Sequence, residues 1–224
     1  MKPSHNYSSL LEEIEKLKSI HRIKHDIRIV VVTKYASVEE VIELLSNSPV
    51  TDIGENRVQE AEKKFLTLSQ LGLLNNIKKH MVGTVQSNKV TKIVKLFDFI
   101  HSIENTKIPE ELRKRNFQGE LLLEVKTSPE ATKHGIEPEK TVEFFGELLS
   151  SGIEISGLMT IAPYTNDEIT ISKCFSTLRN LKEKIENTFS VKLKYLSMGM
   201  SNDYKIAISE GANLLRIGTL IFRK

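Results

Sequence analysis

Short apolar runs alternate with amphipathic helical patterns along the chain. A leading helix is predicted over residues 7–23, and apolar side chains at helical spacing predict further helices over residues 38–45, 56–68, 88–96, 106–116, 137–150, 167–187 and 203–209. Strands are predicted over residues 27–32, 51–54, 80–83, 97–101, 120–125, within 152–161, and over 192–196 and 214–217. The pattern therefore predicts eight strands that alternate with helices after one leading helix.

Regular alternation of this kind favours parallel βαβ crossovers. Eight units in 224 residues fit a closed barrel, and the chain has no linker, low-complexity segment or repeat period. A doubly wound open sheet also alternates, but its Gly-rich phosphate turn is absent, because residues 34–37 after the first strand contain no glycine. We therefore predict an α/β fold, a single (β/α)8 TIM-type barrel over residues 1–224 with an extra N-terminal helix.

Composition excludes several classes of partner. The net charge of +3 is small and the basic residues are scattered, so no nucleic-acid surface is predicted. The chain shows neither a signal peptide nor an apolar run of membrane-spanning length, so no membrane partner is predicted. The single cysteine, Cys174, excludes an internal disulfide and disfavours a cysteine metal site. These features together predict a protein of the reducing cytoplasm.

The first predicted strand leads directly to a lysine. Residues 27–32 are mostly β-branched, which suits a strand buried on both faces, and Lys34 follows at the carboxyl end. This is where α/β barrels place reactive groups. A partly desolvated amine there loses its proton more easily and can attack a carbonyl to form an imine. The alternative is a lysine that extends into solvent.

The segments after the last two predicted strands suggest a phosphate site. Barrels commonly bind phosphate at the loops that follow strands seven and eight. Gly199 and Gly218 would let the backbone approach an anion closely, and Ser201 and Thr219 would add hydroxyl donors. The alternative is that Ser201 or Asn202 only caps the helix predicted from residue 203.

Other polar residues at the strand ends have two interpretations each. Arg216 ends an apolar strand, so it either binds a ligand or forms a structural ion pair with Glu55 or another acid. Asn56 either caps a helix or contacts a ligand. Met200 either packs or lines a flat ligand, as do Met159 and Met198.

The two histidines at strand positions, His80 and His101, are interpreted as structural rather than as acid–base groups. No His, Asp and Glu spacing typical of a metal site occurs, and no serine or cysteine nucleophile motif occurs.

Six ordered segments carry a family resemblance. They are VTK at 32–34, GENRVQE at 54–60, GTVQSNK at 83–89, GLMT at 157–160, LSMGMS at 196–201 and RIGT at 216–219. From about the first strand to the C-terminus the chain resembles the YggS/PROSC family of pyridoxal phosphate homeostasis proteins, which is similar to the barrel domain of alanine racemase.

The resemblance implies a pyridoxal 5'-phosphate (PLP) site. Lys34 would carry PLP as a Schiff base, and Arg216 would face the pyridine nitrogen. Asn56 would lie near the ring. Met200 would also contact the cofactor. Ser201, Gly218 and Thr219 would surround its phosphate group, and we call these three residues the phosphate cradle.

The chain departs from the family pattern at some positions. Lys126 replaces an asparagine, Thr84 a bulkier basic residue and Asn202 a frequent aspartate, and the tail after the last strand is short. Lys89, Lys126 and Lys133 lie on the same predicted face as Lys34, so a second PLP-binding lysine is an open alternative.

The predicted chemistry favours a carrier over an enzyme. An arginine cannot protonate the pyridine nitrogen as a carboxylic acid can, which weakens the electron sink that turnover needs. Racemisation also needs an acid–base group on the opposite face of the substrate. In alanine racemases this group is a tyrosine from an added β-domain of the partner subunit. We expect no such domain here, so Tyr35 and Tyr164 are the candidates for that role.

The leading hypothesis is therefore a PLP carrier that buffers the free aldehyde and delivers it to apo-enzymes. A small PLP-dependent amino-acid racemase is the alternative, and a cofactor-free barrel enzyme acting on a phosphorylated metabolite is the third hypothesis. Without the β-domain, a monomer is expected.

Overall fold

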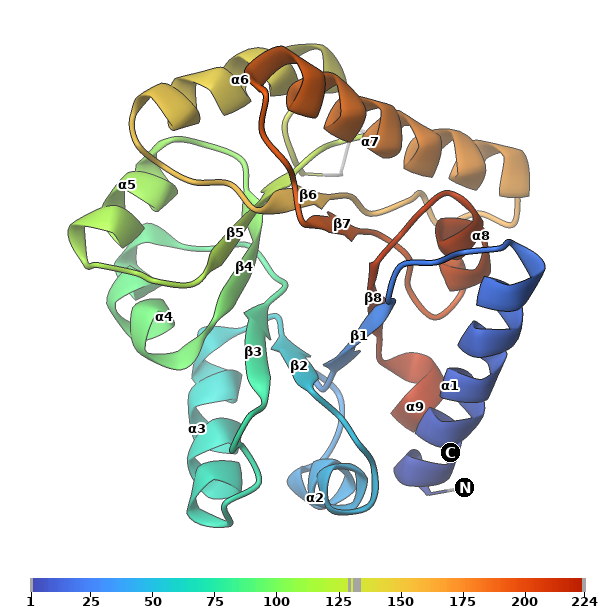
Figure 1. Ribbon diagram of the computed structural model, residues 1–224. Coiled ribbons are helices and arrows are strands. Elements are labelled where there is room, and N and C mark those ends of the chain that lie inside the picture. Colours follow the sequence, from blue (N-terminus) through green and yellow to red (C-terminus); the bar gives the residue numbers. More distant parts are fainter. Residues whose placement is uncertain (1, 129, 131–133, 223–224) are drawn as a thin grey trace.

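The protein is a closed barrel of parallel strands surrounded by helices (Figure 1). The computed structural model describes residues 2–128, 130 and 134–222. Eight strands pair in chain order, and the pairing of the first with the last closes the ring. Every strand pairing is parallel. The predicted (β/α)8 barrel with a leading helix is confirmed.

The strands are short and the helices vary in length. The strands are β1 (Arg28–Val32), β2 (Asp52–Glu55), β3 (Lys78–Met81), β4 (Phe99–Ile103), β5 (Glu120–Glu124), β6 (Gly157–Met159), β7 (Tyr195–Ser197) and β8 (Leu214–Ile217). The helices are α1 (Pro3–Ile20), α2 (Val38–Asn47), α3 (Val58–Gln70), α4 (Val90–Leu96), α5 (Lys107–Lys114), α6 (Pro138–Ser150), α7 (Glu168–Phe189), α8 (Tyr204–Ser209) and α9 (Thr219–Phe222), with a 3-10 turn, η1 (Ser87–Lys89).

The bounds of most elements differ from the predicted ones by one to four residues. Strand β4 starts two residues later than predicted because β3 pairs with it in the register His80 to Phe99. His101 therefore lies inside β4 instead of at its end. The last helix, α9, was not predicted, because four residues carry no helical period. It lies beside α1, which brings the two ends of the chain together (Figure 1).

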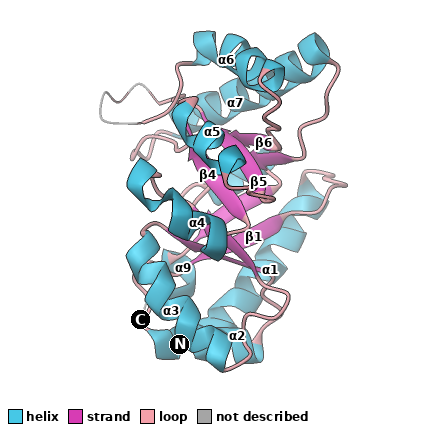
Figure 2. Cartoon of the chain, turned by 90° about the vertical axis from the view of Figure 1, so that its left-hand side faces the viewer, coloured by secondary structure: helices cyan, strands magenta, loops and turns pink. Residues whose placement is uncertain are grey.

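The apolar core has two parts. The larger part contains most of the buried apolar side chains of the helices together with those of the strands, and the helices wrap the strands on the outside (Figure 2). A smaller separate cluster combines Val30, Phe99, Leu122, Met159 and Leu214, which come from five different strands. Barrel interiors are usually filled by apolar layers of this kind. Here the same strands also carry buried polar residues, some of which contact residues of the candidate site.

Candidate functional site

A cavity of about 810 Å³ opens where the carboxyl ends of several strands meet. Its lining includes every residue that the sequence pointed to as a cofactor contact: Lys34, Asn56, Met200, Ser201, Arg216, Gly218 and Thr219. These residues come from segments that follow β1, β2 and β7 and from β8 with its following turn. The structure therefore brings together residues that are far apart in the sequence. Lys34 and Thr219 are separated by 185 positions.

Lys34 lies just beyond β1 at the mouth of the cavity. Its side chain is exposed, and its Nζ lies 4.9 Å from the centre of the Tyr35 ring. The turn that carries it is closed by a hydrogen bond from the Ala36 N–H to the Thr33 carbonyl. The expectation of a partly desolvated amine is wrong, because the Lys34 side chain is exposed although Thr33 before it is buried.

A buried ion pair between Lys64 and Glu55 holds the main chain of this turn. The Lys64 ammonium on α3 donates to the Thr33 carbonyl oxygen at 2.6 Å and to Glu55 Oε1 at 2.6 Å. The Thr33 hydroxyl donates to the same Glu55 oxygen at 2.6 Å. Thr33 and Glu55 have no exposed surface, and Lys64 has 8%. The residue before Lys34 is therefore fixed through both its side chain and its carbonyl.

Arg216 reaches the cavity from the buried end of β8. Its guanidinium donates to the Ser197 hydroxyl at 2.7 Å and to the Thr160 carbonyl at 2.8 Å. Burial lowers its pKa to about 10, and the negative charges of Asp203 and Glu124 oppose that shift. The side chain stays protonated at neutral pH. The alternative of an ion pair with Glu55 or another acid is wrong among the described residues, because the guanidinium bonds Ser197 and Thr160 and Glu55 pairs with Lys64.

The turn after β8 approaches the end of β1 closely. A Cβ added at Gly218 would lie 2.8 Å from the Val32 carbonyl oxygen, so only glycine fits without displacing the backbone. The Ser201 hydroxyl accepts a hydrogen bond from the Leu220 N–H at 3.3 Å, which joins the loop after β7 to α9. Hydroxyl groups and closely packed backbone therefore meet at one end of the cavity.

The capping alternative for Ser201 and Asn202 is wrong. The residue before α8 is Asp203, and its side chain makes no capping bond to that helix. Asp203 instead accepts from the Met200 N–H at 2.5 Å and so closes the loop after β7 on itself. Ser201 binds the first turn of α9, a helix that the sequence did not predict.

The Asn56 side chain lacks a partner within the described chain. Its Oδ1 atom is buried and makes no hydrogen bond there. The residue before α3 is Arg57, so the interpretation of Asn56 as a helix cap is wrong. A buried amide oxygen without a partner is costly, and a ligand in the adjoining cavity would relieve that cost. Met159 and Met198 are buried and pack, as one interpretation proposed, while Met200 lines the cavity.

Of the other candidate lysines, Lys89 and Lys126 are not among the residues that line the first cavity. Lys89 lines a second cavity, of about 660 Å³, with residues of the β2–α3 and β3–α4 connections. Lys126 forms an ion pair of 3.1 Å with Glu137. Lys133 lies outside the described residues. Within the described chain, no group of three or more His, Cys, Asp or Glu side chains could hold a metal ion. No helix in that part of the chain is long and apolar enough to cross a membrane.

Three features of the candidate site could not be identified in the sequence. They are the support of Thr33 by Glu55 and Lys64, the role of Ser197 as a partner of Arg216, and the contribution of Asp203 to the cavity wall. The available signal was a polar residue inside an apolar strand, as with Ser197 and Glu55, but the sequence does not say which partner each one meets.

Sequence comparison places the chain in a family. The family model for the alanine racemase N-terminal domain matches residues 6–223. A pyridoxal phosphate homeostasis protein of Aquifex aeolicus is 39% identical over 188 residues, which is 82% of this chain and 81% of that protein. This chain belongs to the family of pyridoxal phosphate homeostasis proteins. The member from Helicobacter pylori is 34% identical over 223 residues and 96% of each chain.

Solved structures agree with this family. The structure of PipY from Synechococcus elongatus with PLP bound has a TM-score of 0.82 and 27% identity, and the match covers 98% of this chain and 99% of PipY. Alanine racemase of Clostridium difficile has a TM-score of 0.70 at 17% identity, and the match covers 56% of that enzyme. The racemase likeness shows the shared barrel fold alone.

Proposed function

We propose that this protein binds PLP in the cavity of about 810 Å³ and serves in PLP homeostasis by storing and releasing the cofactor. The observation that carries the proposal is the position of Lys34, Ser201, Arg216 and Thr219 on the walls of that one cavity. The names of the curated relatives and the PLP-bound structure of PipY support it.

The donor set fits PLP. The cavity lies within the range of about 300–1,000 Å³ that small-molecule sites occupy. The hydroxyls of Ser201 and Thr219 and the tight turn at Gly218 suit a phosphate. The unpartnered Asn56 amide and the Arg216 guanidinium can bond the polar substituents and nitrogen of a flat aromatic ring.

In this proposal Lys34 binds the cofactor covalently. Lys34 would hold the cofactor through its amine, which can form an imine with an aldehyde as one water molecule leaves. Because Lys34 is exposed at the mouth, water and free amines reach the linkage and can reverse it. Reversible linkage at an open mouth suits a protein that stores and releases an aldehyde.

The side chains around the cavity favour a carrier over an enzyme. PLP in enzymes acts as an electron sink, and a protonated pyridine nitrogen strengthens that sink. Arg216 stays protonated at neutral pH and does not give a proton to the ring. Tyr35 lies against the Lys34 amine, so it is on the same side as the lysine, and Tyr164 is 89% exposed. Neither tyrosine is fixed as the opposite acid–base group of a racemase.

The shared fold with alanine racemase makes racemisation the second candidate function. Incubating the PLP-loaded protein with L-alanine in deuterium oxide separates the two. A carrier gives α-deuterium incorporation equal to that of free PLP at the same concentration. Incorporation well above that background, lost in Tyr164→Phe, would replace the carrier proposal with the racemase.

We also propose that the protein delivers PLP to apo-enzymes, is a monomer and works in the cytoplasm. The cofactor-free enzyme hypothesis predicts a colourless protein that takes up no PLP. A yellow protein with a stoichiometric PLP content would exclude that hypothesis.

A further inference from the structure

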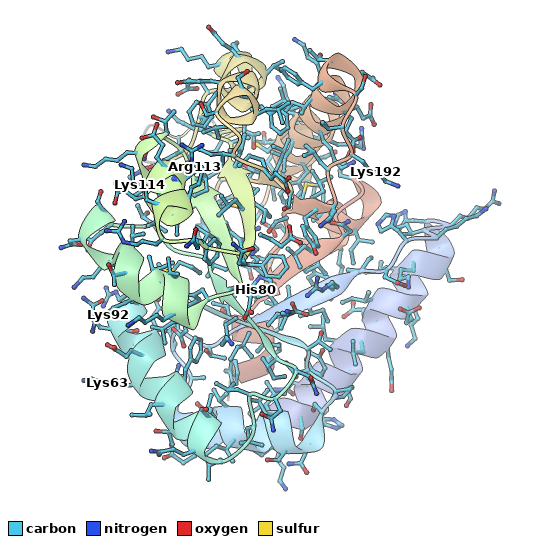
Figure 3. The ribbon with its side chains drawn as sticks, turned by 60° about the vertical axis from the view of Figure 1, so that its left-hand side comes forward. Lys63, His80, Lys92, Arg113, Lys114 and Lys192 are labelled. Atoms are coloured by element: carbon cyan, nitrogen blue, oxygen red, sulfur yellow. The ribbon has the colours of Figure 1, made fainter. Side chains whose placement is uncertain are left out.

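A chain of hydrogen bonds crosses the inside of the barrel and ends at Arg216. Asp52 Oδ1 lies 2.8 Å from His80 Nε2, and His80 Nδ1 lies 2.9 Å from His101 Nε2. His101 Nδ1 lies 3.1 Å from Ser197 Oγ, which accepts from Arg216 at 2.7 Å. We call Asp52, His80, His101 and Ser197 the interior chain. All four have no exposed surface, and Figure 3 shows His80 among the strands.

The direction of every bond in the interior chain follows from the Asp52 end. An ionised carboxylate only accepts, so a neutral His80 carries its hydrogen on Nε2 and donates to Asp52, and its Nδ1 accepts. The donor to His80 Nδ1 is His101 Nε2, so Nδ1 of a neutral His101 accepts from the Ser197 hydroxyl. Ser197 Oγ in turn accepts from Arg216, because a guanidinium only donates.

Both histidines have the neutral form that this arrangement needs. Burial lowers the pKa of His101 well below its ordinary value, and the charges of nearby groups lower it further. Burial also lowers the pKa of His80, against the raising effect of Asp52. Every donor in the chain therefore points from Arg216 towards the Asp52 carboxylate.

The Asp52 end of the interior chain is also held by hydrogen bonds. Arg28, at the start of β1, donates to the Asp52 carboxylate, and Thr51 donates to it at 2.6 Å. The Arg28 guanidinium lies 5.4 Å from the centre of the Phe99 ring and 5.8 Å from that of Tyr195. The chain thus runs from the amino-terminal end of the strands to the wall of the cavity.

We propose that Asp52, His80, His101 and Ser197 are positioning residues, which hold the Arg216 guanidinium in the orientation that faces the pyridine nitrogen of the cofactor. This role rests on the proposed function. A barrel interior needs no polar residues for packing, since apolar layers fill most barrels. Here a continuous polar chain ends on a guanidinium in the cavity wall, whose only other acceptor among the described residues is the Thr160 carbonyl.

The first experiment tests the interior chain without any cofactor. Nitrogen-15 NMR of the PLP-free protein, labelled at histidine, reports which ring nitrogen carries hydrogen. Comparison of the wild type with His80→Gln and His101→Gln assigns the two rings. The expected result is hydrogen on Nε2 of both. Hydrogen on Nδ1 of either ring, or on both nitrogens of one ring, would overturn these bond directions.

The second experiment tests positioning. Ser197→Ala and His101→Leu cut the chain, whereas a glutamine at 101 can still accept from Ser197 and donate to His80. Ser102→Ala is the matched control, because the hydroxyl of this buried β4 serine donates to the Gly83 carbonyl and takes no part in the interior chain. Loss of a hydrogen bond to a charged group predicts about tenfold weaker PLP binding for Ser197→Ala and His101→Leu. We also expect a shifted absorption maximum of their bound cofactor.

His101→Gln and Ser102→Ala are expected to keep the affinity within about twofold and the spectrum of the wild type. Unchanged affinity and spectrum in both Ser197→Ala and His101→Leu would overturn the positioning role, as would an equal loss in Ser102→Ala. Failure of the wild type to bind PLP would instead refute the proposed function, and the histidine spectra would still decide whether the interior chain has these directions.

Discussion

Lys64 donates a hydrogen bond of 2.6 Å to the main-chain carbonyl of Thr33, the residue before Lys34. The same ammonium neutralises Glu55, a carboxylate with no exposed surface. The main chain immediately before Lys34 is therefore held by a buried ion pair.

The substitution Lys64→Met tests this support. It leaves Glu55 buried without its counter-charge, and breaking a buried pair in this way costs about 3–5 kcal/mol of unfolding free energy. Adding Glu55→Gln removes the stranded charge and is expected to recover about half of that loss. Urea denaturation of the two variants and the wild type measures both effects.

The control for Lys64→Met is the same substitution at Lys92, a surface residue on α4 that pairs with Glu62 at 2.6 Å (Figure 3). Exposed pairs contribute about 0–1 kcal/mol, so Lys92→Met is expected to change stability little. Equal losses in Lys64→Met and Lys92→Met would contradict the structural role given to the buried pair.

Gly218→Ala is expected to disturb the turn after β8. The added methyl group would meet the Val32 carbonyl oxygen at 2.8 Å, and backbone cannot give way as a flexible side chain can. We expect a loss of about 1–3 kcal/mol of stability and at least tenfold weaker PLP binding. Gly146→Ala on α6 is the control, because its methyl group meets the Phe189 ring far from the cavity residues. PLP affinity unchanged in Gly218→Ala would refute the cradle assignment.

Arg216→Lys keeps the positive charge and removes the planar fork. One ammonium cannot reproduce the paired bonds to the Ser197 hydroxyl and the Thr160 carbonyl with the same geometry. We expect PLP binding weaker by about 10–100-fold, as for loss of an interaction worth roughly 1.5–3 kcal/mol. Spectroscopic titration with PLP measures this. Arg179→Lys, in a partly exposed pair with Glu210, is the control and should bind PLP as the wild type does.

The buried histidines predict a stability that falls in acid. Because the folded-state pKa values of His80 and His101 are lowered, the unfolded chain takes up protons near pH 6.5 that the folded protein does not bind. Their contribution is complete above that pH and is lost as the pH falls below it. Each neutral histidine adds a slope of up to about 1.4 kcal/mol per pH unit.

One carboxyl group opposes this trend. Burial raises the pKa of Glu124 to about 7, so the folded state binds its proton more tightly, and that contribution is lost as the pH rises from 4.5 to 7. The His101→Gln variant isolates the histidine effect. Its unfolding free energy should fall about 1 kcal/mol less than that of the wild type between pH 6 and 5. The control is His21→Gln, because His21 is exposed. An identical fall in the wild type and His101→Gln would contradict the role given to His101.

Much of the architecture could be predicted, because it depends on local patterns. Alternating apolar runs and helical periods indicated the barrel. The polar segments at strand ends, together with the family resemblance, indicated the residues from Lys34 to Thr219 that line the cavity. The burial of His101 could not be predicted, because it depends on the register between β3 and β4. Its bond to Ser197 joins residues 96 positions apart.

The errors have the same physical origin. The sequence allows Ser201 to cap the next helix along the chain, but this serine bonds a residue of α9, which follows β8. It also allows Glu55 to pair with Arg216, but Lys64, nine residues along the chain on α3, binds that carboxylate. In both cases the partner is set by how elements pack, which local composition does not encode.

We propose above all that Lys34 carries PLP covalently at the mouth of the barrel. The most direct measurement is the absorption spectrum of the PLP-treated protein, followed by borohydride reduction and peptide mass mapping, with Lys34→Ala and Lys89→Ala in parallel. The account predicts a yellow protein whose phosphopyridoxyl group is found on Lys34, unchanged in Lys89→Ala and absent in Lys34→Ala. A colourless protein without the modification, or one modified chiefly at another lysine, would contradict it.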